Sequence, residues 1–323
     1  MPFILLTNYY SKNPLRIIEE ELPEGFNLIL LDKACKKELV EKAGNADYFL
    51  AGGRIPIDRE VVNAAINLKM IQRTGVGVDK FDLDMLKEKG IPVYVNRGVN
   101  SRSVAEHTLM LILSVLRRLP LLDNSVKKGS WLKHELGVEC SELYNKRVGL
   151  VGLGNIGVEV AKMLQAFGAR VIYFGPSRLP KCEEKVLNVS YCSLPELLKE
   201  ADIISLHCPL NSKTEKMINR KEIATMKSGA IIINTSRGRL IDEDALINSL
   251  KFGHLKGAGL DVYAKEPLSK NSPLLNLDNV VLTPHVGGLT SETFRRMMRD
   301  AFQNIRLFEE GKRARLECKR LQQ

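Results

Sequence analysis

The stretch Arg147-Val-Gly-Leu-Val-Gly-Leu-Gly-Asn-Ile-Gly157 decides the fold of this chain. Residues 147–151 form an apolar, β-branched run that predicts a strand, and residues 158–167 have the amphipathic pattern of a helix. Between them, Gly152, Gly154 and Gly157 permit a tight turn and a close approach of the backbone to a pyrophosphate at the helix N-terminus. The sequence therefore predicts a dinucleotide-binding turn; the alternative is a turn that is tight for structural reasons only.

The next expected strand, 170–174, ends at a position that bears on the choice of nicotinamide cofactor. Gly175 stands where dinucleotide sites usually carry an acidic residue for the ribose hydroxyls. Ser177 and Arg178 follow, and an arginine suits a phosphate at this place. We therefore expect NAD(P)H as cofactor and favour NADP(H), with Ser177 and Arg178 as contacts. The alternative is that Arg178 points into solvent.

Further short apolar runs recur on both sides of this turn, with room for a helix between them. This pattern is typical of βαβ units and parallel sheets. The expected strands are 3–6, 28–31, 48–51, 70–73 and 93–96 in a first set, and 147–152, 170–174, 203–207, 230–235, 257–262 and 280–283 in a second. Helices are expected over 101–119, with Pro120 just past the end, and over 291–310. The sequence predicts an α/β protein with two doubly wound sheets.

Size and composition limit the possible classes of protein. With 323 residues, 44% hydrophobic and 27% charged, the chain is long enough for two globular domains. The net charge of +10 comes from dispersed basic residues, apart from the tail 312–320, so we expect no nucleic-acid partner. The six scattered cysteines predict reduced thiols and no metal site. No stretch approaches a membrane span and the first residues predict a strand, so we expect a cytoplasmic protein without membrane contacts.

Three polar residues follow expected strands of the second set and are candidates for catalysis. Arg237 comes just after 230–235, where its guanidinium would face a ligand crevice and suit a carboxylate. His285 follows 280–283, and Glu266 could orient its ring, because a carboxylate bonded to one ring nitrogen fixes the tautomer. Taken singly, each could be an ordinary surface residue. We expect structural roles for the other histidines, which are His107, His134, His207 and His254.

Several longer motifs occur in a fixed order along the chain. They are Val76-Gly-Val-Asp79, Asn96-x-x-x-Asn100-Ser-x-Ser-Val-Ala-Glu106, Asn234-Thr-Ser-Arg-Gly-Arg-Leu-Ile-Asp242, Asp261-Val-Tyr-Ala-Lys-Glu-Pro267 and Thr283-Pro-His-Val-Gly-Gly288. With the glycine turn, they resemble the D-isomer-specific 2-hydroxyacid dehydrogenase family, which includes phosphoglycerate dehydrogenases and glyoxylate/hydroxypyruvate reductases. Gly175 and the basic tail depart from the family pattern.

The resemblance implies roles for individual residues. Arg237 would bind the substrate carboxylate and keto oxygen, His285 would donate and accept the proton, and Glu266 would be its partner. Val76 and Gly77 would lie near the substrate. The implied cofactor contacts are Gly152, Gly154, Asn155, Ile156, Gly157, Ser177, Arg178, Cys208, Thr235, Ser236, Asp261, Gly287 and Gly288.

The resemblance also implies a domain arrangement and a reaction. A split substrate-binding domain, residues 1–100 and 289–323, would hold an inserted NAD(P)-binding Rossmann domain, residues 101–288, with the active site in the cleft and a homodimer as assembly. The expected activity interconverts a small 2-keto acid and its D-2-hydroxy acid; candidates are glyoxylate, hydroxypyruvate, pyruvate and 3-phosphohydroxypyruvate. The alternative is a weakly catalytic, nucleotide-sensing corepressor-like scaffold of the same fold.

Overall fold

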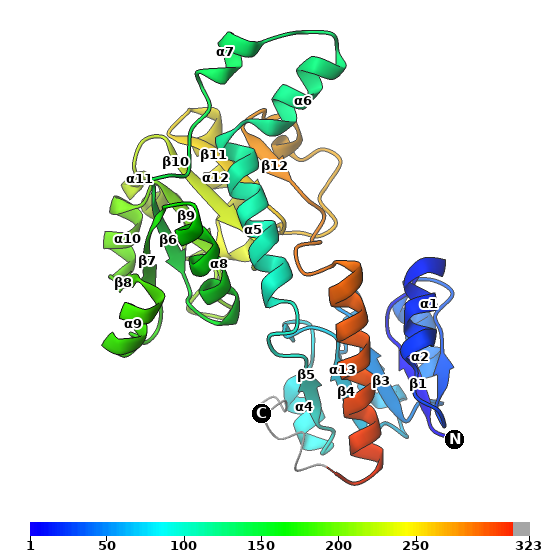
Figure 1. Ribbon diagram of the computed structural model, residues 1–323. Coiled ribbons are helices and arrows are strands. Elements are labelled where there is room, and N and C mark those ends of the chain that lie inside the picture. Colours follow the sequence, from blue (N-terminus) through cyan, green and yellow to red (C-terminus); the bar gives the residue numbers. More distant parts are fainter. Residues whose placement is uncertain (313–323) are drawn as a thin grey trace. The chain divides into compact units, whose positions relative to one another are not determined.

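The computed structural model describes residues 1–312, which form two compact units. The first unit combines residues 1–100 with the segment from residue 289 onward, and the second contains residues 101–288. Figure 1 colours the chain from blue to red and shows that each unit has its own sheet. The basic tail noted in the sequence lies outside the described residues from residue 313 onward.

The first unit is built on a parallel sheet with the strand order β2-β1-β3-β4-β5. Its strands are β1 (Phe3–Leu6), β2 (Asn27–Ile29), β3 (Tyr48–Ala51), β4 (Met70–Arg73) and β5 (Val93–Val95). Its helices are α1 (Lys12–Glu21), α2 (Lys36–Ala43), α3 (Arg59–Ala64), α4 (Leu83–Glu88) and α13 (Ser291–Glu309). Successive strand residues face opposite layers, because Leu5 packs in one core cluster while Ile4 and Leu6 pack in another. The sheet is therefore covered on both faces.

The second unit is built on a longer parallel sheet with the order β12-β11-β10-β9-β6-β7-β8. Its strands are β6 (Arg147–Val151), β7 (Arg170–Phe174), β8 (Val189–Tyr191), β9 (Ile203–Leu206), β10 (Ala230–Asn234), β11 (Leu255–Leu260) and β12 (Val280–Leu282). The chain winds outward from β6 through β7 to β8, then returns to place β9 on the other side of β6. The switch in direction between β6 and β9 is where open α/β sheets bind ligands, at the C-terminal ends of the strands.

Helices cover both faces of this second sheet (Figure 1). Helices α5 (Ser101–Leu116) and α8 (Asn155–Ala166) pack against each other and against strands of one face, while α10 (Leu194–Glu200) and α12 (Glu243–Lys251) pack on the other. The remaining elements are α6 (Leu119–Lys127), α7 (Lys133–Gly137), α9 (Lys181–Leu187), α11 (Arg220–Thr225) and the 3-10 turns η1 (Gly238–Leu240) and η2 (Pro273–Asn276). The predicted α/β class with two doubly wound parallel sheets is confirmed.

Some predicted boundaries were wrong for identifiable reasons. The helix expected over 101–119 ends at Leu116, since Arg118 adopts a left-handed conformation with φ of 49° and α6 begins at Leu119. Pro120 therefore lies in the first turn of a new helix, where its missing amide hydrogen costs nothing. The sequence did not predict strand β8, because only one of its three residues, Val189, is buried. Among residues 1–312, no helix is long and apolar enough to span a membrane.

Candidate active site

The glycine turn after β6 has the geometry of a nucleotide-phosphate cradle. Gly152 adopts φ of 102°, and a Cβ atom there would lie 2.8 Å from the carbonyl carbon of His207. A Cβ on Gly157 would lie 2.4 Å from the carbonyl oxygen of Gly152. Glycine is thus required at both positions, because the turn is packed against the end of β9 and against the first turn of α8.

The middle glycine of the turn, Gly154, leaves space where an anion would sit. Gly154 is the N-cap residue of α8, and no side chain forms a capping hydrogen bond there. A Cβ atom built on Gly154 would have no other atom within 4 Å. The first amide groups of α8, from Asn155 and Ile156 to Gly157, belong to a helix N-terminus that no side chain caps. An open helix N-terminus at the sheet's switch point fits the pyrophosphate of a dinucleotide.

A hydrogen bond connects the segments that follow β9 and β10 beside this cradle. The Ser236 hydroxyl donates to the Cys208 carbonyl oxygen at 2.6 Å, and Thr235 Oγ1 lies 3.0 Å from Thr108 Oγ1 of α5. Burial raises the pKa of the Cys208 thiol to about 11, so this thiol stays neutral and is not a nucleophile near neutral pH. Burial also lowers the pKa of His207 to about 4, which keeps its ring neutral.

Arg237 follows β10 and caps the short 3-10 turn η1. Its carbonyl accepts a 2.9 Å bond from the Asn234 side chain, and its guanidinium donates to the Ser236 carbonyl at 2.8 Å. A Cβ on Gly238 would lie 1.9 Å from the carbonyl carbon of Tyr263, so this turn presses against the loop after β11. The half-buried Arg237 is thereby held at the C-terminal edge of the sheet, next to the loop that carries Glu266.

His285 and Glu266 form a direct pair. His285 Nδ1 lies 2.8 Å from Glu266 Oε2, with side chains 48% and 34% exposed. Glu266 Oε1 also accepts from the Tyr263 amide at 3.2 Å. His285 has φ of 56°, a left-handed conformation that turns the chain directly after β12. With Glu266 accepting at Nδ1, the proton sits on Nδ1 and the other ring nitrogen, Nε2, is available for proton exchange.

A buried carboxylate fixes the loop on which His285 stands. Asp261, at the end of β11, accepts bonds from Thr283 Oγ1 at 2.6 Å and from the amides of Val286 and Gly287 at 2.9 and 2.8 Å. Burial acts to raise the pKa of Asp261, but bonds from His107, Thr283 and these two amides outweigh it and hold the pKa below its usual value. Asp261 is therefore a fixed negative charge among the predicted cofactor contacts.

His107 is a residue that the sequence did not single out for the site. Its Nε2 lies 2.9 Å from Thr283 Oγ1 and 3.4 Å from Asp261 Oδ1; we expected a structural role for this histidine. The signal was weak because residues 107 and 283 are far apart in the chain and only the fold brings them together. No group of metal-binding side chains occurs among residues 1–312.

The other predicted residues fall in two places. Val76 and Gly77 lie in the first unit, in a loop held by a 2.9 Å bond from Arg73 Nε to the Gly77 carbonyl. Gly287 and Gly288 follow His285 in the second unit, and a Cβ on Gly287 would lie 2.9 Å from Asp261 Oδ2. Ser177 is exposed beside Gly175, but the Arg178 guanidinium is bound by Glu184 and does not point freely into solvent.

Comparison with known proteins identifies the family of this chain. The profile described as "D-isomer specific 2-hydroxyacid dehydrogenase, NAD binding domain" matches residues 109–287. The chain belongs to this family. A hydroxypyruvate reductase of Thermotoga maritima is 42% identical over 264 residues, which are 81% of this chain and 84% of that protein.

Two further relatives define the range of similarity within this 2-hydroxyacid dehydrogenase family. A D-3-phosphoglycerate dehydrogenase of Methanocaldococcus jannaschii is 41% identical over 295 residues, which cover 90% of this chain but 54% of that protein; the chain thus spans about half of its length. The crystal structure of an Aquifex aeolicus D-lactate dehydrogenase complexed with NAD and lactic acid has a TM-score of 0.88 and 29% identity, and covers 99% of this chain and 98% of that one.

Proposed function

We propose that this protein interconverts a small 2-keto acid and its D-2-hydroxy acid with a nicotinamide cofactor. The observation that carries the proposal is the 2.8 Å contact between His285 Nδ1 and Glu266 Oε2, in the unit that holds the glycine cradle. Both the pair and the cradle stand at C-terminal ends of strands in one parallel sheet, the edge at which such sheets bind ligands. An acid–base pair at a dinucleotide site is what reversible carbonyl reduction requires.

Three residues of this chain take roles in the proposed reaction. The cofactor supplies or accepts the hydride. During reduction, His285 delivers a proton from Nε2 to the carbonyl oxygen, and Glu266 stabilises the positively charged ring that precedes this transfer. Arg237 holds the substrate carboxylate and stabilises the negative charge that develops on the oxygen. In oxidation His285 accepts the proton. We assign Val76 and Gly77, with Arg237, to substrate binding.

For the cofactor, we propose that the protein accepts both NADH and NADPH. Gly175 supplies no carboxylate that would repel a 2′-phosphate, and a Cβ at this position would meet only the Ser177 carbonyl oxygen, at 3.6 Å. Arg178 is the cation that would favour NADPH, but Glu184 holds it in a bidentate pair. The preference for NADP(H) that the sequence favoured thus depends on a competition at Arg178.

For the substrate, we propose glyoxylate, hydroxypyruvate, pyruvate or 3-phosphohydroxypyruvate. Relatives named hydroxypyruvate reductase, glyoxylate reductase and D-3-phosphoglycerate dehydrogenase support this range. Because these relatives are named as enzymes, they favour catalysis over the corepressor-like scaffold.

We also propose a homodimer formed through α5, α6 and α7. Large apolar side chains with exposed fractions between 42% and 81% lie on α5 and α6, in the loop between α6 and α7 and directly after α7: Met110, Leu119, Val126, Trp131 and Val138. In Figure 1, α6 and α7 extend beyond the sheet of their own unit. Exposed apolar surface of this kind marks an interface.

A panel of 2-keto acids tested with NADH and with NADPH examines the proposed activity. Oxidation of the reduced cofactor, followed by its absorbance, should occur with at least one acid and should be stereospecific for the D-2-hydroxy product. His285→Gln should lose most of this activity, while His254→Gln, which changes the histidine directly before β11, should keep it. Absence of turnover with every acid and both cofactors would favour the scaffold.

A further inference from the structure

An ion pair joins the loop after β7 to α9, and the proposed hydride and proton transfers do not use it. Arg178 Nε donates to Glu184 Oε1 at 2.9 Å, and one terminal nitrogen donates to Glu184 Oε2 at 2.7 Å. Two parallel bonds of this length make the bidentate arrangement that is the strongest geometry for an arginine and a carboxylate. Arg178 lies three residues after Gly175, and Glu184 lies on α9.

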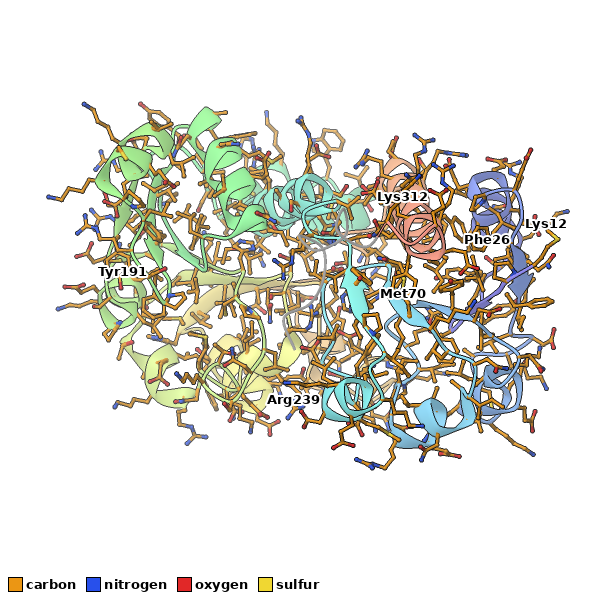
Figure 2. The ribbon with its side chains drawn as sticks, turned by 90° about the horizontal axis from the view of Figure 1, so that it is seen from below. Lys12, Phe26, Met70, Tyr191, Arg239 and Lys312 are labelled. Carbon is orange, nitrogen blue, oxygen red and sulfur yellow. The ribbon has the colours of Figure 1, made fainter. Side chains whose placement is uncertain are left out.

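Two tyrosines fix the pair in place. The Tyr173 hydroxyl donates to Glu184 Oε1 at 2.9 Å and accepts from the Leu179 amide at 2.8 Å, so it binds the carboxylate and the loop together. The Arg178 guanidinium lies 5.8 Å from the centre of the Tyr191 ring, which packs edge-on against Tyr173. Figure 2 labels Tyr191, which belongs to the edge strand β8 of the second unit.

The two partners differ in how far they face solvent. The Glu184 side chain is 9% exposed, whereas the Arg178 side chain is 52% exposed. Arg178 lowers the pKa of Glu184, against the opposing effect of burial and with help from Tyr173, so this carboxylate is ionised near neutral pH. Glu184 is thus a charged anchor that already accepts three bonds, and Arg178 is the accessible member of the pair.

We propose that Glu184 determines the choice between NADH and NADPH by holding Arg178. A 2′-phosphate beside Gly175 must draw the guanidinium away from a carboxylate that offers the same two-oxygen geometry. Glu184 therefore lowers the gain that Arg178 gives to NADPH and leaves binding of the unphosphorylated ribose unchanged. This inference rests on the nucleotide site of the proposed function, and it names a specificity residue that acts through Arg178 without touching the cofactor.

Binding of adenosine fragments tests the proposal without any turnover. Isothermal titration calorimetry gives the Kd of adenosine 5′-phosphate and of adenosine 2′,5′-bisphosphate for the full chain. In Glu184→Gln, the affinity ratio should move about tenfold toward the bisphosphate, which equals ~1.4 kcal/mol. Tyr173→Phe, which keeps both charges but loosens Glu184, should move it in the same direction by a smaller factor.

Two controls separate this mechanism from a general charge effect. Glu183→Gln removes the same charge from the neighbouring, exposed position of α9 and should leave the ratio within about twofold. In an Arg178→Ala background, Glu184→Gln should have no further effect, because the coupling between the two residues is then absent.

The outcomes separate this inference from the proposed function. An unchanged ratio in Glu184→Gln, an equal change in Glu183→Gln, or a change that persists without Arg178 overturns the role of Glu184 and leaves the proposed reaction standing. If neither nucleotide binds the native chain, the nucleotide site fails and the inference fails with it. If the ratio moves as expected but no keto acid is reduced, Glu184 keeps its role and the proposed reaction is wrong.

Discussion

The pair of His285 and Glu266 should matter for catalysis far more than for stability. The side chains are 48% and 34% exposed, and pairs at such positions contribute about 0–1 kcal/mol to folding. Glu266→Gln retains an oxygen for the Tyr263 amide, so the variant should unfold within about 3 °C of the native chain. A loss of activity in this variant can then be assigned to the site and not to the fold.

The expected losses follow from the roles of the two side chains. His285→Gln removes the proton donor and should lower kcat/KM for reduction by about 10²–10⁴. Glu266→Gln replaces a charge-assisted hydrogen bond by a neutral one, a difference of ~1–1.5 kcal/mol, and should cost about tenfold. The double variant should be no worse than His285→Gln alone, because Glu266 has no ring left to stabilise.

A matched control is Glu243→Gln, since Glu243 accepts a 3.0 Å bond from the Ala264 amide of the same loop. It removes a neighbouring negative charge without contact to His285 and should leave kcat/KM within about twofold of the native value. Losses that multiply in the double variant, or an unchanged kcat/KM in Glu266→Gln, would refute the idea that the two residues act as a unit.

Three further outcomes are expected. Arg237→Ala should lose about 2–5 kcal/mol of transition-state stabilisation, measured as kcat/KM of a variant whose circular dichroism is native; near-normal efficiency would remove Arg237 from the substrate site. Burial lowers the pKa of His207 from 6.5 to about 4, so as the pH falls below 6.5 this histidine binds a proton in the unfolded chain but not in the folded one. This difference lowers the free energy of unfolding by about 2 kcal/mol at pH 5. In urea unfolding, the free energy of unfolding of His207→Gln should therefore decrease less at acid pH than that of the native protein. An equal decrease in both proteins would contradict this prediction. Trp131→Glu should convert the proposed dimer to a monomer in sedimentation, and a monomeric native protein would disprove the interface.

The sequence predicted those parts of the fold that short-range patterns determine. The cradle was predictable because a Cβ atom at position 152 or 157 would meet backbone atoms at 2.8 and 2.4 Å, so no other residue fits the turn. The end of α5 was harder, since a left-handed residue at Arg118 leaves little trace in the pattern of apolar residues.

The sequence predicted the candidate site only where the type of side chain indicates its chemical role. His285, Glu266 and Arg237 lie in the loops that follow strands, and in the structure His285 Nδ1 lies 2.8 Å from Glu266 Oε2. His107 could not be assigned, because its bond to Thr283 joins α5 to the loop after β12 across 176 residues of chain. The residues around a histidine on an apolar helix do not indicate a hydrogen-bond partner that lies so far along the chain.

Arg178 shows why cofactor preference is harder to predict than cofactor binding. The sequence shows that position 175 lacks a carboxylate and that an arginine follows, and these facts favour NADPH if the arginine is available. Availability is a property of packing: Glu184 lies six positions after Arg178, a spacing that no helical periodicity marks, and Tyr173 sets the geometry between them. Specificity is a difference between two affinities, so a carboxylate that competes for the same guanidinium counts as much as the guanidinium itself. A family member with an equivalent arginine but no carboxylate at the Glu184 position should therefore prefer NADPH more strongly than this protein does.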